Sequence, residues 1–158
     1  MKSIVKQRKG FSLIELMVVI AIIGIGASIS WESLSNARNQ TKVNGACESA
    51  AVTINKARSY ALAGLAGVNA VRAHCDQDAA TGVGLCSVQS SGDGGSSWTD
   101  IVGESYAFPA NVLMDASLDI VYALPYASPA VVNEKSYTLS AGQSSATLVT
   151  SNFKASCR

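Results

Sequence analysis

The sequence predicts an α+β fold, in which one long N-terminal helix packs on a C-terminal antiparallel β-sheet. Two observations carry this prediction. The helical pattern is continuous from residue 11 to about residue 63, first as an apolar run and then as an amphipathic one. After Gly67 the pattern changes to short β-like runs separated by Gly, Ser, Asp and Pro. The 158 residues therefore leave room for one modest soluble domain built on the helix.

Residues 1–10 form a short basic leader that ends at Gly10. Its four cations are Lys2, Lys6, Arg8 and Lys9. The formal net charge of +1 includes them, and without them the remaining 8 basic residues face 11 acidic residues, a net charge of −3. Bulk charge therefore does not indicate a basic surface for nucleic acid.

Residues 11–31 form an apolar segment that contains one carboxylate, Glu15. A helix of this length rises about 31 Å, which is enough to cross a bilayer core. A lone carboxylate there costs on the order of 3 kcal/mol or more, so Glu15 is expected to be functional. The basic leader is expected to stay in the cytoplasm while the rest of the chain is exported.

Two simpler interpretations of this N-terminus are an ordinary secretory signal peptide and a plain membrane anchor. A signal peptide would be cleaved after the apolar run, and Ala27–Ser30 offers the small residues for such a cut. It gives no reason for a helical pattern that continues past Trp31. Neither interpretation explains Glu15.

Residues 32–66 read as the amphipathic continuation of the helix, which Gly64 and Gly67 end. Its apolar side chains recur at three- and four-residue steps, with one longer gap. They are Leu34, Ala37, Val43, Ala46, Ala50, Ile54, Ala57, Ala61 and Leu62. This stripe is expected to pack against the sheet.

Residues 67–158 are expected to form a β-rich globular head. The candidate strands are Asn69–His74, Gly84–Val88, Ser105–Phe108, Leu118–Leu124, Ser136–Ser140 and Ala146–Thr150. The last two are joined by a short Ser- and Gly-containing segment, which is typical of a hairpin. The segment Ser90–Ser97 is expected to be a flexible loop.

The four cysteines, an even number in an exported domain, suggest two disulfides, for which three pairings are possible. Cys75 and Cys86 bracket a polar loop and look like neighbours across a hairpin. Cys47 lies on the predicted helix and Cys157 is the penultimate residue, so that pair would tie the C-terminus to the helix. The spacing of His74, Cys75 and Cys86 does not suit zinc, and no metal site is expected.

The junction Lys9-Gly10-Phe11-Ser12-Leu13-Ile14-Glu15 resembles the class III signal of type IV pilins and type II secretion pseudopilins. The resemblance implies that a prepilin peptidase cuts between Gly10 and Phe11 and then methylates the new N-terminus of Phe11. It also implies that Glu15 of one subunit meets the amine of Phe11 of a neighbour during assembly. Residues 54–62 and 120–129 resemble, more weakly, minor pilins and H-type pseudopilins. Pilins often close a C-terminal disulfide loop, although its partner is not usually on the helix.

The function implied is that of a structural subunit of a type IV pilus or pilus-like pseudopilus filament. Its expected partners are the prepilin peptidase, other pilin or pseudopilin subunits and, before assembly, the inner membrane. The protein is expected to be a single-pass inner (cytoplasmic) membrane protein first, and part of an extracellular or periplasmic filament afterwards.

The alternative is a minor pilin that acts as a binding module at the filament tip, for example for DNA during natural transformation. Such binding would use Lys135, Lys154 and Arg158, with Arg72. Phosphate neutralisation dominates affinity for DNA, so a net charge of −3 counts against this alternative.

The sequence does not suggest an enzyme, and no cofactor is expected. The single histidine, His74, stands beside a cysteine expected to be in a disulfide, whereas a Cys–His nucleophile needs a free thiolate. Asp76 and Asp78 lack the remaining ligands of a calcium-binding loop.

Overall fold

The computed structural model describes residues 11–78, 81–124, 128–129, 134–151 and 154–158. One long helix, α1 (Leu13–Ala63), precedes the strands. They are β1 (Ala70–Gln77), β2 (Gly84–Ser91), β3 (Thr99–Ala107), β4 (Leu113–Met114), β5 (Leu118–Ala123), β6 (Ser128–Pro129), β7 (Lys135–Ala141), β8 (Ser144–Ser151) and β9 (Lys154–Cys157). The predicted α+β class is confirmed, and every described pairing between strands is antiparallel.

The chain divides into two units, residues 1–35 and residues 36–158. In the described part of the first unit, α1 begins directly after Ser12, whose carbonyl accepts a hydrogen bond of 3.2 Å from the N–H of Leu16. In the second unit α1 ends at Ala63, as the glycines predict. Gly64 adopts a φ of 68° and donates its N–H to the carbonyl of Tyr60 at 3.2 Å, a left-handed helix cap.

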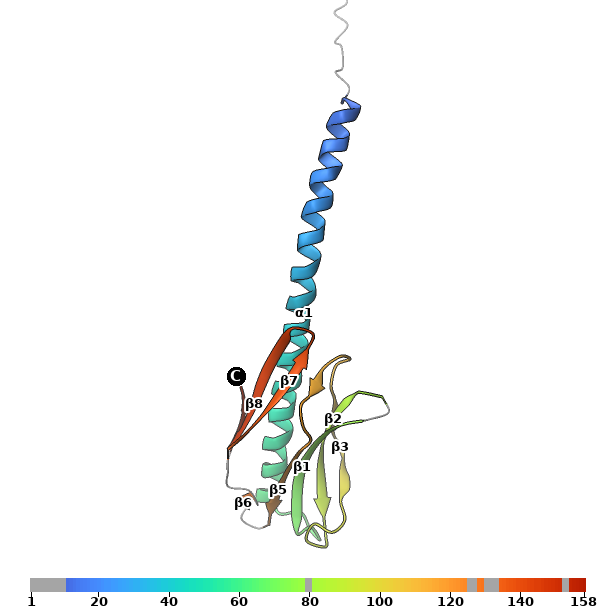
Figure 1. Ribbon diagram of the computed structural model, residues 1–158. Helices are drawn as coiled ribbons and strands as arrows, with labels where there is room; N and C mark the ends of the chain where they lie inside the picture. Colours follow the sequence, from blue (N-terminus) through green and yellow to red (C-terminus); the bar gives the residue numbers. More distant parts are fainter. Residues whose placement is uncertain (1–10, 79–80, 125–127, 130–133, 152–153) are drawn as a thin grey trace, which may run out of the picture. The chain divides into compact units, whose positions relative to one another are not determined.

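The strands of the second unit form two sheets rather than the single sheet expected (Figure 1). The first has the order β3-β2-β1-β5-β6 and the second the order β4-β7-β8-β9. Both cover α1 with apolar side chains that are fully buried, among them Val71, Val88, Leu139 and Leu148. Burying such side chains supplies most of the stability of the head.

The face of α1 that meets the two sheets is made mostly of small residues. Its buried members are Val43, Ala46, Cys47, Ala50, Ala51, Ile54, Ala57 and Ala61. Six of these buried residues belong to the stripe predicted from the sequence. The other three predicted residues, Leu34, Ala37 and Leu62, are exposed. Small side chains allow strands to approach the helix closely, so a narrow stripe is enough for the core.

Edge strand β3 contains a large, irregular β-bulge. Ser105 lies opposite Ser87 and Asp100 opposite Gln89, so the four residues 101–104 face one residue of β2. Gly103 has a φ of 83°, and Val102 is 98% exposed. The bulge interrupts the alternation of side chains, which explains why the sequence predicted this strand only from Ser105 onward.

Glu104 links the bulge to α1 through an ion pair and a hydrogen bond. One carboxylate oxygen lies 2.6 Å from Nζ of Lys56, and the other accepts a hydrogen bond of 3.0 Å from the hydroxyl of Tyr60. The hydrogen bond from Lys56, followed by that from Tyr60, lowers the pKa of Glu104. The hydrogen bond to Glu104 also raises the pKa of Lys56. Three side chains thus hold the edge strand against the helix.

This cluster predicts a loss of stability in acid. Because its pKa is lowered, Glu104 stabilises the fold above its ordinary value of 4.5, and this contribution disappears as the pH falls through that range. We expect the melting temperature of the wild type to fall more between pH 6 and pH 3 than that of Glu104→Gln. Thermal unfolding followed by circular dichroism at the two pH values tests this. An equal fall in the melting temperature of the two proteins would contradict it.

The segment after β2 is organised by the carboxylate of Asp93. It accepts hydrogen bonds from the hydroxyls of Ser91 and Ser97, both at 2.6 Å, and from the N–H groups of Ser96 and Ser97. These bonds, that of Ser91 first, hold the pKa of Asp93 far below its ordinary value. The expected flexible loop is therefore a turn closed around one acidic side chain.

Gly84 is required at the start of β2 by the ring of Phe108. A Cβ on Gly84 would lie 2.1 Å from Cδ2 of this buried ring, and the N–H of Phe108 bonds to the carbonyl of Gly84 at 2.7 Å. We expect Gly84→Ala to destabilise the head by roughly 1–3 kcal/mol, because the ring must move within a packed core. Chemical denaturation measures this.

Gly45 offers the matched control for Gly84. It lies within α1, and a Cβ there would meet nothing within 4 Å. We expect Gly45→Ala to stabilise the protein by about 1 kcal/mol, because alanine is the better helix former. A Gly84→Ala protein as stable as the wild type would contradict the packing argument.

Candidate assembly and processing site

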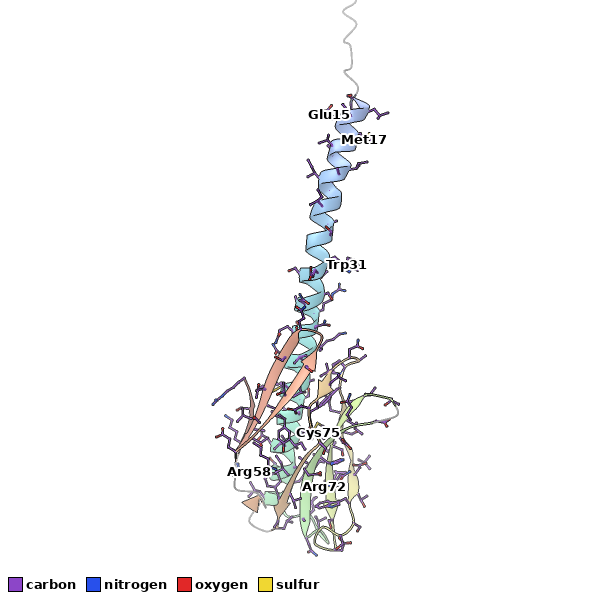
Figure 2. The ribbon with its side chains drawn as sticks, in the orientation of Figure 1. Glu15, Met17, Trp31, Arg58, Arg72 and Cys75 are labelled. Atoms are coloured by element: carbon purple, nitrogen blue, oxygen red, sulfur yellow. A yellow bond between two sulfur atoms is a disulfide. The ribbon has the colours of Figure 1, made fainter. Side chains whose placement is uncertain are left out.

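The residues expected to take part in processing and assembly belong to the segment where α1 begins. Gly10, the expected cleavage position, is outside the described residues. Phe11 and Ser12 precede the helix, and Glu15 lies in its first turn (Figure 2). Ser12 and Glu15 have the spacing of a capping box, a signal that the sequence contains but that our reasoning from sequence did not use. The helix dipole also favours a negative charge at this end.

Phe11 and Glu15 are both accessible to another molecule. Phe11 is 84% exposed, and Glu15 is exposed as well. No ion pair to Glu15 forms among the residues that the structure describes. A carboxylate in an apolar segment that forms no ion pair with the described residues of its own chain is available for a cation on a neighbour.

The surface around Glu15 is apolar and uncovered. The large apolar side chains of this stretch are all exposed, namely Leu13, Ile14, Leu16, Met17, Val18, Val19, Ile20, Ile22, Ile23 and Ile25. The helix is long and apolar enough to cross a membrane. So large an apolar surface requires either lipid or protein around it in the cell.

Both cysteine pairs that the sequence favoured are joined in the structure. Cys75 and Cys86 face each other directly on β1 and β2, with a Cα–Cα distance of 4.0 Å. Cys47 on α1 is bonded to Cys157 on β9, with a Cα–Cα distance of 5.9 Å. All four cysteines lie in the second unit, where the two bonds brace the head.

His74 belongs to a polar network on the first sheet. Its Nδ1 lies 2.8 Å from Oδ1 of Asp119, and the same oxygen lies 3.2 Å from Nη1 of Arg72. Arg72 also donates from Nε to Gln89 at 2.6 Å and stacks 4.5 Å from the ring centre of Trp98. Over the described ranges, no three His, Cys, Asp or Glu side chains are grouped so that they could hold a metal ion.

The four cations of the DNA-binding alternative do not form one surface. Arg72 lies on the first sheet and is paired with Asp119, Lys135 and Lys154 lie on the second sheet, and Arg158 directly follows β9. Lys135 faces Thr150 and Lys154 faces Ser151, which are consecutive residues of β8. Consecutive strand residues point to opposite faces, so these two lysines do as well. The arrangement of these four cations therefore does not favour DNA as a ligand.

Residues 5–31 match the prokaryotic N-terminal methylation motif, the signature of type IV pilins. This match confirms the resemblance drawn from the junction at Gly10 and Phe11. No curated protein and no solved structure matches the chain. The long N-terminal helix followed by antiparallel sheets is a pilin-like arrangement. The motif is that of a structural family rather than of an enzyme family, and it implies processing by a prepilin peptidase and assembly with other pilin subunits.

Proposed function

We propose that this protein is a structural subunit of a type IV pilus or pilus-like pseudopilus filament, assembled through its N-terminal helix after prepilin peptidase cleavage. The observation that carries the proposal is the coincidence of two features in one segment. Residues 5–31 match the methylation motif, and the helix within this segment leaves its apolar side chains exposed in the single chain.

Cleavage after Gly10 creates a positive amine on Phe11 at the edge of the apolar segment. Glu15 of a neighbouring subunit supplies the opposite charge. Two opposite charges attract far more strongly in a low dielectric than in water, so the pair fixes how far one helix is shifted along the next. Methylation of the amine leaves its positive charge in place.

Packing of the apolar helices supplies the remaining contacts. Before assembly the helix spans the inner membrane once, and on assembly it exchanges lipid for protein neighbours. Gly24 and Gly26 lie on this helix, and a Cβ at either position would meet nothing within 4 Å. Small residues of this kind allow neighbouring helix backbones to approach closely. The finished filament is then extracellular or periplasmic.

Intact mass spectrometry of filaments sheared from the cells tests the proposal. The expected species consists of residues 11–158 with one added methyl group and two disulfides. A filament fraction that contains the protein with Met1 or Lys2 retained would contradict the processing step. Absence of the protein from every purified filament of cells that express it would contradict the structural role.

A further inference from the structure

The two disulfides differ in how accessible they are to a reagent. Cys75 and Cys86 are fully buried, and β1 and β2 each have a strand on both sides. Cys47 is fully buried as well, but its partner Cys157 is exposed. A thiolate in solution can therefore approach the Cys47–Cys157 bond from the side of the exposed Cys157, whereas both residues of the other bond are buried.

Strand β9, which carries Cys157, is otherwise weakly held. It is a four-residue edge strand that, among the described strands, pairs with β8 alone. Ala155 is its one buried residue, and an alanine contributes little apolar area. Its N–H reaches Oδ1 of Asn55 on α1 at 3.4 Å. The disulfide is thus the strongest link between β9 and the helix.

We propose that the Cys47–Cys157 disulfide is a redox-sensitive latch, which holds β9 on the head and releases it when a dithiol reduces the bond. One thiolate of the dithiol attacks Sγ of Cys157, the S–S bond breaks, and Cys47 leaves as a thiolate that takes up a proton. The second thiol then displaces Cys157. The dithiol becomes a disulfide, and the protein gains two electrons and two protons.

Release of β9 would uncover the outer edge of β8. Thr147 and Arg158 exchange two hydrogen bonds of 2.9 Å. Because such pairs alternate along an antiparallel ladder, Val149 and Ser151 also direct their N–H groups toward β9, whereas Leu148 and Thr150 direct theirs toward β7. A groove of about 530 Å³ already lies between α1 and β9, with Ala51 and Ala146 in its lining, and loss of the strand would remove the wall formed by Ala155, Ser156 and Cys157. The reduced head therefore has an unpaired strand edge beside apolar surface.

The latch is tested on the processed protein, residues 11–158, in detergent. The protein is reduced stepwise with increasing concentrations of dithiothreitol. Thiols are alkylated at each concentration, and amide hydrogen exchange is followed by mass spectrometry or NMR. We expect Cys47 and Cys157 to be alkylated at a reductant concentration at least tenfold lower than Cys75 and Cys86. At that point the amides of Val149 and Ser151 should exchange at least tenfold faster, with those of Leu148 and Thr150 unchanged.

Matched double variants separate the latch from a general loss of stability. Cys47→Ser with Cys157→Ser should show fast exchange at Val149 without reductant. Cys75→Ser with Cys86→Ser removes the same number of cysteines and should keep this amide protected. If either variant fails to fold, the wild-type titration still decides. Reduction of both bonds at one concentration, or unchanged exchange at Val149 after Cys47 and Cys157 are reduced, would overturn the proposal.

Discussion

Cells that express Glu15→Val should insert the protein into the membrane normally but form at least tenfold fewer filaments. Replacing the carboxylate by an apolar side chain lowers the cost of membrane insertion, so the precursor should accumulate there. Docking of one subunit on the next should be weaker, because the amine of Phe11 on each neighbour then has no opposite charge nearby in a region of low dielectric constant. Quantitative immunoblots of sheared filaments and of membrane fractions measure the two effects separately.

The position of Glu15 in the first turn of α1 requires a control, because this residue can also stabilise the start of the helix. Glu15→Gln keeps the side chain that a capping box accepts and removes only the charge. If the charge matters, Glu15→Gln should assemble as poorly as Glu15→Val, and Glu15→Asp should recover part of the yield. Normal filament yield from Glu15→Gln would show that Glu15 serves helix capping and not docking.

Gly10→Leu should leave the protein in the membrane as the uncleaved precursor, with almost no mature form. The proposed peptidase cuts after this residue and requires a small side chain there, so a bulky one blocks access to the bond. Gly10→Ala, the smallest possible change, should still be processed. The readout is the intact mass, which differs between precursor and product by residues 1–10.

The processing experiment also separates two causes of missing filaments. A Gly10→Leu protein that is cleaved as efficiently as the wild type would show that the cut lies elsewhere in the N-terminal segment. Gly24→Ala places the same kind of change inside the helix, where an added Cβ meets nothing within 4 Å, and should be processed normally. Loss of processing in that variant would point to a membrane-insertion defect instead.

The helix and the N-terminal methylation motif were predictable because each rests on a local signal. An apolar run is followed by a stripe with a period of three to four residues in α1, and the left-handed Gly64 ends the helix. Glu15 stands out because a carboxylate in an apolar segment is costly whatever the fold. The capping position of Ser12 is an equally local signal, because Ser12 and Glu15 have the spacing of a capping box.

The arrangement of the head was less predictable because it depends on pairing between distant residues. The division into two sheets follows from register, which short polar strands specify weakly. The four-residue strand β9 has no alternating apolar pattern, and its place is set by the bond to Cys47 and by β8. The bulge in β3 depends on Gly103 and on the contact of Glu104 with α1, which no local pattern reveals.

The bond between Cys47 and Cys157 also determines how the chain carries mechanical load. These residues are 110 positions apart in sequence, and the bond joins them directly. A tension applied between the two ends of the chain passes along α1 to Cys47, crosses the disulfide and leaves through Arg158. The strands between lie outside this path and cannot be pulled straight, so about 340 Å of chain that the Cys75–Cys86 bond does not already bridge is withheld from the force. A subunit built in this way can transmit a pull along its helix without unravelling its sheets.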